Sequence, residues 1–129
     1  MPVLVDEQAV SAHVVDAAIA VHRVFGPGLL ESACAAALAI EFAERGLFFV
    51  CDAPINARYR GRPLGVVYRA DSIVENKVLI ETKAVRTIED IHIAQVLSYL
   101  RLGGFKLGLL LNFNVPVMKQ GIKRIVNDL

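Results

Sequence analysis

The feature that most constrains the fold is an apolar segment near the C-terminus, at residues 106–113. It holds four leucines around Gly108 and no polar alternation. Such a segment is typical of a strand that is buried on both faces, as parallel strands usually are. A second apolar run ends at residues 78–80, and residues 88–102 between the two show helical spacing. The pattern predicts two parallel strands joined by a crossover helix.

Two helices are predicted before this unit. Asp6 is suited to cap a helix over about residues 8–24, and Gly26-Pro27-Gly28 would end it. An alanine-rich helix over about residues 29–45 would follow and stop at Gly46. The apolar stripe of the first helix consists of Val10, Val14, Ala17, Ala18, Val21 and Phe25, and the inner face of the second contains Leu38 and Phe42.

The middle of the chain reads as an antiparallel meander. Its predicted strands are residues 47–51, 54–60, 64–71 and 77–83, with a last short strand at 122–126. The third helix is predicted to begin after Thr87 as its cap and to stop at Gly103. We therefore expect an α/β fold, a mixed β-sheet flanked by α-helices, in a single domain of residues 1–129.

Composition limits the cellular context. The chain is 55% apolar, yet no apolar run approaches the roughly 18 residues that span a bilayer. Residues 1–6 lack the basic start and apolar stretch of a signal peptide, so we expect a cytoplasmic protein that does not enter the membrane. The high apolar content suits a homodimer. Cys34 and Cys51 are expected to be buried, reduced thiols.

Asp71 and the triplet Glu81-Thr82-Lys83 lie on either side of a turn predicted at Asn76. A turn centred there places Asp71 opposite Glu81, with Cβ atoms about 5 Å apart. Two carboxylates at that separation repel each other unless a cation or a proton lies between them. Lys83 projects from the same strand face as Glu81. The hairpin thus has the local chemistry of a divalent metal site with a lysine beside it.

A hard cation such as Mg²⁺ or Mn²⁺ prefers oxygen ligands and polarises bound water. Asp71 and Glu81 would supply carboxylates, and the carbonyl of Thr82 would supply a third oxygen. Lys83 would orient the attacking water or stabilise charge on a phosphate. The alternative is a solvated hairpin end at which Lys83 pairs with Glu81.

The predicted third helix carries a polar stripe. His92, Gln95 and Tyr99 fall at positions i, i+3 and i+7, on one side of a helix that begins shortly after Lys83. These three side chains would face the same space as the open end of the hairpin that carries Asp71 and Glu81. Alternatively, Gln95 and Tyr99 are hydrogen-bonded core residues and His92 lies on the surface.

Three other features allow two interpretations each. Glu31, in the first turn of the second helix, is favoured there by the helix dipole alone. His22 is expected to be a packed or capping residue rather than a ligand. Arg58, Arg60 and Arg62 cluster in a half of the chain, residues 58–129, that has twelve basic and six acidic residues. They would hold phosphates or protect a solvated edge strand from aggregation.

Several motifs together resemble the small bacterial GxxExxY proteins, which are placed in the PD-(D/E)XK nuclease superfamily. The resemblance covers nearly the whole chain. It rests on residues 21–32 (VHRVFGPGLLES), 68–71 (YRAD), 81–85 (ETKAV), 92–100 (HIAQVLSYL), 111–116 (LNFNVP) and 121–124 (GIKR).

The resemblance implies roles for individual residues. Asp71 and Glu81 would bind metal and Lys83 would be the catalytic lysine, while Glu31 would be an additional acid on a helix. Gln95 and Tyr99 match the Gln-x-x-x-Tyr helix motif of the superfamily's exonuclease-like branch, in which such an additional acid is also found. Cys34 departs from the pattern, because the family has its final tyrosine at that position.

The leading hypothesis from the sequence is a Mg²⁺-dependent nuclease that hydrolyses phosphodiester bonds of DNA or RNA. The alternative is a non-catalytic nucleic-acid-binding or protein-assembly module that retains the nuclease fold. A third hypothesis is a small-molecule hydrolase that uses the same metal.

Overall fold

The computed structural model describes residues 6–129, which form three α-helices and one five-stranded sheet. Along the chain these are α1 (Glu7–Phe25), α2 (Glu31–Glu44), β1 (Phe49–Tyr59), β2 (Arg62–Val74), β3 (Val78–Lys83), α3 (Asp90–Gly103), β4 (Leu107–Asn112), the 3₁₀ turn η1 (Met118–Gly121) and β5 (Ile122–Val126). The prediction that residues 1–6 lack the features of a signal peptide falls mostly outside the described part of the chain, which begins at residue 6.

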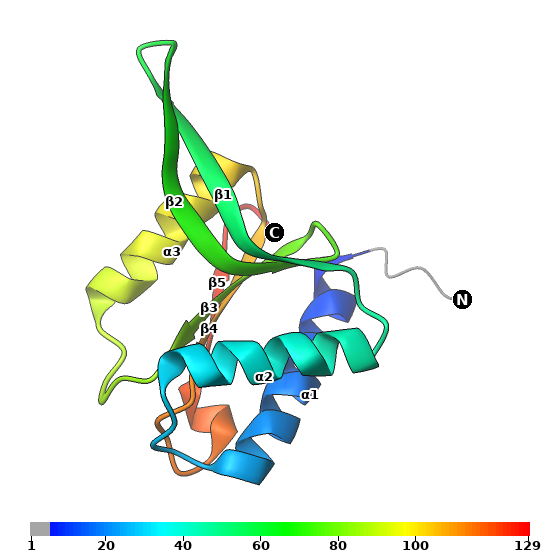
Figure 1. Cartoon of the computed structure of the whole chain (residues 1–129). Helices are drawn as coiled ribbons and strands as arrows, with labels where there is room; N and C mark the ends of the chain where they lie inside the picture. The colour runs from blue at the N-terminus through cyan, green and yellow to red at the C-terminus, as the bar shows by residue number, and fades with distance from the viewer. Residues whose placement is uncertain (1–5) are drawn as a thin grey trace.

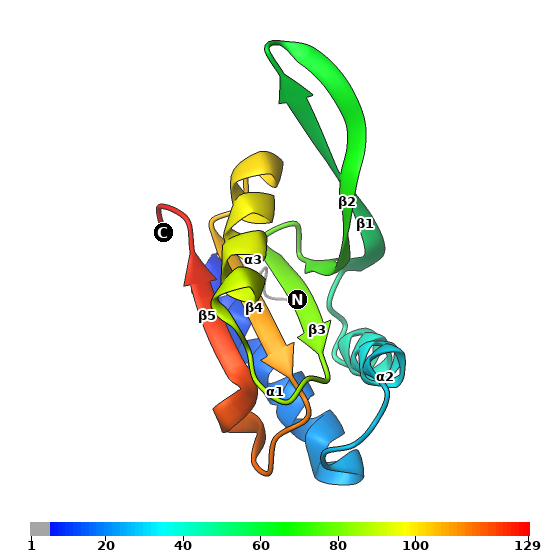
Figure 2. The same cartoon turned by 90° about the vertical axis from the view of Figure 1, so that its left-hand side faces the viewer.

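The sheet has the strand order β1-β2-β3-β4-β5. Neighbouring strands are antiparallel except for β3 and β4, which are parallel. Helices α1 and α2 lie on one side of the sheet and α3 on the other (Figures 1 and 2). The predicted α/β fold, with a mixed sheet flanked by helices, is confirmed.

The β3-α3-β4 crossover is the unit that the apolar segments predicted. Every residue of β4 is buried, because leucines 107, 109 and 111 pack with the α1 and α2 side and Leu110 packs with α3. Gly108 lets α3 approach closely, since a Cβ atom there would lie 2.9 Å from Cγ1 of Val96. Burial on both faces explains why this strand shows no polar alternation.

The N-terminal helices also follow their sequence signals. Oδ1 of Asp6 accepts a hydrogen bond from the Ala9 amide at 2.8 Å and caps α1. Gly26, with φ of 65°, ends that helix. The predicted apolar stripe is buried except for Phe25, which is 53% exposed. Its inclusion was wrong because α1 ends at that residue, before another element covers it.

The predicted break in the first strand is also wrong. Residues 47–51 and 54–60 were expected as separate strands, but β1 runs through Asp52, Ala53 and Pro54. Proline is tolerated because β1 is an edge strand, where a missing N–H costs no ladder hydrogen bond. Asp52 has a φ of 50°, and the register of β1 with β2 shifts only after Pro54, between Ile55 and Asn56 and between Ala57 and Arg58.

Two further boundaries differ from prediction. Helix α3 is capped by Glu89 rather than Thr87, and the ring of His92 accepts the Glu89 amide hydrogen at 3.0 Å. Strand β2 is longer than predicted, and only its last residues, Ser72 to Val74, pair with β3. The rest of β2 continues with β1 as a hairpin that projects from the sheet (Figure 1).

None of the helices in the described part of the chain is long and apolar enough to cross a membrane.

Candidate active site where two strands diverge

Asp71 and Glu81 lie where β2 diverges from β3. The β2–β3 ladder ends at the pair Ser72 and Ile80, so the next position in register brings the two acids together, as the turn at Asn76 predicted. Beyond this pair, hydrogen bonds from backbone amides to carboxylates take the place of the backbone hydrogen bonds of the ladder. The Asp71 amide donates to Oε1 of Glu81 at 3.1 Å, and the Thr82 amide donates to Oδ2 of Asp71 at 2.8 Å. Each carboxylate thus binds the backbone of the opposite strand.

Both acids are protonated more readily than in water. Glu81 is only 4% exposed, and burial raises its pKa to about 7, with a smaller rise from the charge of Asp71 and an opposing effect of the Tyr68 hydroxyl, which donates to it. The pKa of half-buried Asp71 is raised, first by burial and then by the charge of Glu31, against the effect of the Thr82 amide. A nearby cation would favour the charged form of both groups.

Lys83 and Glu31 complete the charged groups around this point. Lys83, at the end of β3, lowers the pKa of both Asp71 and Glu81 but forms no ion pair with either. The only ion pair within the described residues joins Glu41 and Arg45 on α2. The solvated salt bridge between Lys83 and Glu81 is therefore absent, and Glu81 is buried instead of solvated.

Glu31 bonds across the molecule rather than within its own helix. Its Oε1 accepts the amide hydrogen of Ala84, just beyond β3, at 3.3 Å. This contact connects the first turn of α2 to the end of the strand that carries Glu81 and Lys83. Its negative charge also raises the pKa of Asp71 and of the Cys34 thiol. The interpretation of Glu31 as a mere helix-capping residue does not explain this long-range bond.

Helix α3 reaches the acids through two stacked tyrosines. The ring of Tyr99 lies parallel to that of Tyr68, with centroids 3.5 Å apart and an angle of 8° between the planes. The Tyr68 hydroxyl bonds Glu81, and the charge of Glu81 contributes to a raised pKa of Tyr99. Tyr99 thus lies against Tyr68 and near the charge of Glu81, and its role in a functional site stays a prediction.

The other members of that stripe lie differently. The side chain of Gln95 is exposed and forms no hydrogen bond with another described residue, so it is not the core residue of the alternative interpretation. His92 is engaged at the start of α3 with Glu89. The stripe therefore contributes one residue that stacks on Tyr68 and, about one helical turn away, one exposed amide.

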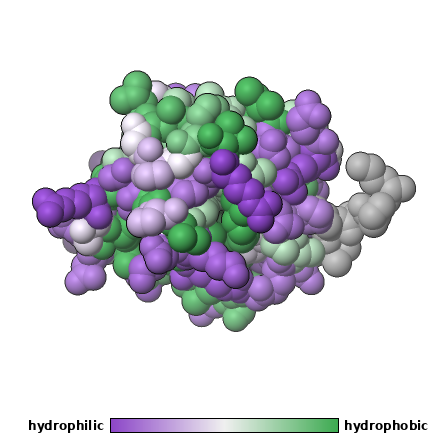
Figure 3. Space-filling model, turned by 90° about the horizontal axis from the view of Figure 1, so that it is seen from below, coloured by the Kyte–Doolittle hydropathy of each residue, from purple (hydrophilic) through white to green (hydrophobic). Residues whose placement is uncertain are grey.

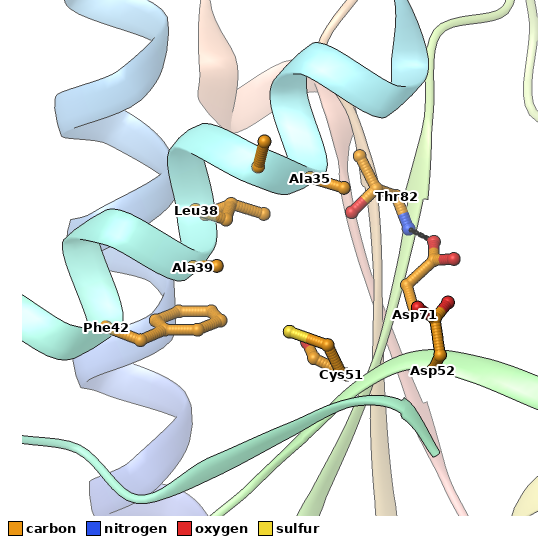
Figure 4. Close-up of a pocket in the computed structure, with 10 residues that line it drawn as sticks. Ala35, Leu38, Ala39, Phe42, Cys51, Asp52, Asp71 and Thr82 are labelled. Carbon is orange, nitrogen blue, oxygen red and sulfur yellow. Dashed lines mark hydrogen bonds between the residues drawn. The ribbon is translucent and has the colours of Figure 1, made fainter. Parts of the chain in front are cut away.

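On the α2 side, Asp71 and Thr82 border a cleft of about 210 Å³ (Figure 4). The small alanines of α2 leave this space open, and Asp52 stands beside Asp71 from the neighbouring strand. The cleft is lined by Ala35, Ala36, Leu38, Ala39, Phe42, Cys51, Asp52, Asp71, Ser72 and Thr82.

The two cysteines differ in their surroundings. Cys34 is buried as predicted and packs with Leu38 in the core. At the position where the GxxExxY pattern has its final tyrosine, this chain therefore has a small core side chain. Cys51 is exposed at the cleft, and its predicted burial was wrong. An edge strand leaves one side of each residue open, which the sequence spacing did not indicate.

Asn112 is a structural residue that sequence analysis missed. It is buried at the end of β4, where its Oδ1 accepts the Val85 amide hydrogen at 3.0 Å and its Nδ2 donates to the Val85 carbonyl at 2.9 Å. It thereby fixes the loop that follows Lys83. A single polar residue at the end of a wholly apolar strand was the available signal.

His22 is buried with Nε2 2.8 Å from the Val115 carbonyl oxygen, which confirms it as a packed histidine.

The mixed sheet, the paired acids and the lysine two residues further along β3 define an α/β protein with a nuclease-like core. Residues 8–125 match the model of the PD-(D/E)XK nuclease superfamily, and the chain belongs to that superfamily. No curated protein and no solved structure gives a significant match to the chain. The finer resemblance to GxxExxY proteins stays a prediction.

Proposed function

We propose that this protein is a Mg²⁺-dependent nuclease that hydrolyses phosphodiester bonds in nucleic acid. The observation that supports it most is the juxtaposition of Asp71, Glu81 and Lys83 at the point where two strands diverge, in a chain of the PD-(D/E)XK nuclease superfamily. Superfamily membership favours a nuclease over the small-molecule hydrolase that the same groups would also serve.

The donor set fits Mg²⁺ better than an ion that needs a complete cage of side chains. Within the described residues no three His, Cys, Asp or Glu side chains group closely enough to hold a metal alone. Mg²⁺, however, commonly takes one or two carboxylates and completes its shell with water and phosphate oxygens. Asp71 and Glu81 would provide the carboxylates and the Thr82 carbonyl another oxygen. When bound, such an ion neutralises the buried acids and polarises water and phosphate.

The surrounding side chains would then have separate tasks. Lys83, which is free of ion pairs with the acids, would orient the attacking water and stabilise charge on the phosphate. Tyr99 would hold the Tyr68 ring, so that the Tyr68 hydroxyl keeps Glu81 in position. Glu31 would support the loop after β3 and add a further acid, and the exposed Gln95 would contact the phosphate backbone.

The test is cleavage of single- and double-stranded DNA and RNA with Mg²⁺ or Mn²⁺. We expect Lys83→Ala and Glu81→Gln each to lower the rate about 100-fold or more, since each removes charge stabilisation at the reacting phosphate. Lys77→Ala is the matched control, because it removes a lysine from the other end of the same strand region. Full activity in Lys83→Ala would refute the assignment.

A second candidate function is a non-catalytic assembly module. Apolar side chains gather in several groups on the face opposite the projecting hairpin (Figure 3). There Val24, Phe25 and Val117 are all more than half exposed around a groove of about 560 Å³. Such a surface suits self-association. A dimer in solution that lacks metal-dependent cleavage of every substrate tested would favour this candidate over the nuclease.

A further inference from the structure

The hairpin of β1 and β2 forms an arm, residues 53–70, that extends well beyond the rest of the sheet (Figures 1 and 2). Strand β3 supports β2 only at residues 72–74. The arm ends in a tight turn at Arg60 and Gly61, which have φ angles of 54° and 76°. Nη1 of Arg58 donates to the Gly61 carbonyl at 3.0 Å and fastens this turn. The arm is thus a two-stranded antiparallel ribbon with register irregularities between Ile55 and Asn56 and between Ala57 and Arg58, and a hydrogen bond holds its tip.

The charge on the arm has one sign. Residues 53–70 include four arginines and no acidic residue. Arg58 and Arg69 bond backbone carbonyls, whereas Arg60 and Arg62 are exposed and form no hydrogen bond or ion pair within the described residues. A groove of about 520 Å³ between the arm and the end of α3 is lined by Arg58 and by Arg101 from the helix. Positive charge therefore lines both sides of that groove.

The arm also exposes apolar side chains, among them Tyr59, Leu64 and Val66. These would suit a second copy of the chain, but pairing two arms would bring eight arginines together without a compensating acid. The repulsion between like charges weighs against that occupant. A phosphate backbone matches the charge, and a two-stranded ribbon has the dimensions that the major groove of B-form DNA admits.

We infer that the arm is a DNA-gripping element that enters the major groove of duplex DNA. The inference rests on the proposed function, because it adds to that function a contact with duplex DNA away from the site. Asp71 lies nine positions after Arg62, which at about 3.3 Å per residue spans at most about 30 Å along β2. At about 3.4 Å per base pair, the tip contacts DNA about nine base pairs from the phosphate at the site. The deep, narrow major groove of duplex RNA excludes the arm.

The test is binding of a 24-base-pair DNA duplex, measured by fluorescence anisotropy in EDTA over a range of salt concentrations. The result then does not depend on whether cleavage occurs. The variant is Arg60→Gln with Arg62→Gln, and Arg60→Lys with Arg62→Lys restores the charge. Arg23→Gln with Lys119→Gln is the matched control, since it removes two exposed charges near the groove at the end of α1, opposite the arm.

We expect the glutamine variant to bind about 10-fold or more weakly in 0.1 M salt, with the slope of log K against log salt reduced by about 2. The lysine variant should recover most of the affinity, and the control should change it less than about 2-fold. Duplex RNA and an eight-base-pair DNA should show no dependence on the arm. Equal DNA binding by all variants would overturn the inference, as would loss of a dimer as the sole effect. Arm-dependent binding without metal-dependent cleavage would retain the arm and refute the nuclease.

Discussion

Glu81→Gln should stabilise the metal-free protein, and increasingly so as the pH rises. The folded protein binds the Glu81 proton more tightly than the unfolded chain, because burial raises the pKa of this carboxyl from 4.5 to about 7. The wild type therefore has its full stability contribution from Glu81 only below about pH 4.5, and loses it as the pH rises through about 7. Glutamine is uncharged throughout and still offers an oxygen to the Asp71 amide.

The size of the effect follows from the two pKa values. Their separation corresponds to about 3 kcal/mol of unfolding free energy once Glu81 is charged in both states. The variant should thus gain about 2 to 3 kcal/mol relative to wild type between about pH 5 and pH 8.

The assay is urea unfolding at 25 °C, followed by circular dichroism in EDTA at several pH values. Glu44→Gln, an exposed change on α2, is the control and should alter the unfolding free energy by less than about 0.5 kcal/mol at every pH. Adding Mg²⁺ at high pH should stabilise the wild type and leave Glu81→Gln unaffected. A difference between wild type and Glu81→Gln that does not vary with pH would refute the argument from burial.

Three further outcomes are expected. Asn112→Ala should cost about 2 to 3 kcal/mol in urea unfolding, because it leaves the part-buried Val85 amide unpaired and removes the shorter of two hydrogen bonds to the Val85 carbonyl; a loss below about 0.5 kcal/mol would contradict this. Tyr68→Phe keeps the stacked rings but removes the hydroxyl that lowers the pKa of Glu81, so Mg²⁺-dependent cleavage should fall about tenfold and the pH dependence of unfolding should steepen. A thiol reagent should modify Cys51 quickly in the native protein and Cys34 only after unfolding, and rapid reaction of both would disprove the buried position of Cys34.

The parts of the fold that could be predicted were those in which one pattern has one solution. An apolar segment at residues 106–113 after a helix leaves little choice but a buried parallel strand, and β4 is that strand. Pro54 led to the prediction of a break, because proline is excluded from inner strands. The exception for edge strands can be applied only when the position of the strand in the sheet is known. That position in the sheet is a property of the whole topology, and local sequence does not contain it.

The same distinction applies to the site. The pairing of Asp71 with Glu81 follows from counting outward from Asn76, and the structure has that register. The bond of Glu31 to Ala84 spans 53 positions, and only the family resemblance implied a role for Glu31 beyond the helix dipole. The role of Tyr68 depends on the height of α3 above the sheet, which no residue spacing along β2 encodes.

That height is governed by a missing side chain. At position 108 the hydrogen of glycine faces Cγ1 of Val96 and Cδ2 of Leu100, and a methyl group there would lie 2.9 Å and 3.2 Å from them. Branched side chains yield little, so a larger residue would lift the helix as a unit. Tyr99 would rise with it and leave the ring of Tyr68. The stacking of Tyr99 on Tyr68 is therefore adjustable from a position that touches none of the charged groups, which gives this scaffold a way to alter the surroundings of Glu81 while its acids stay in place.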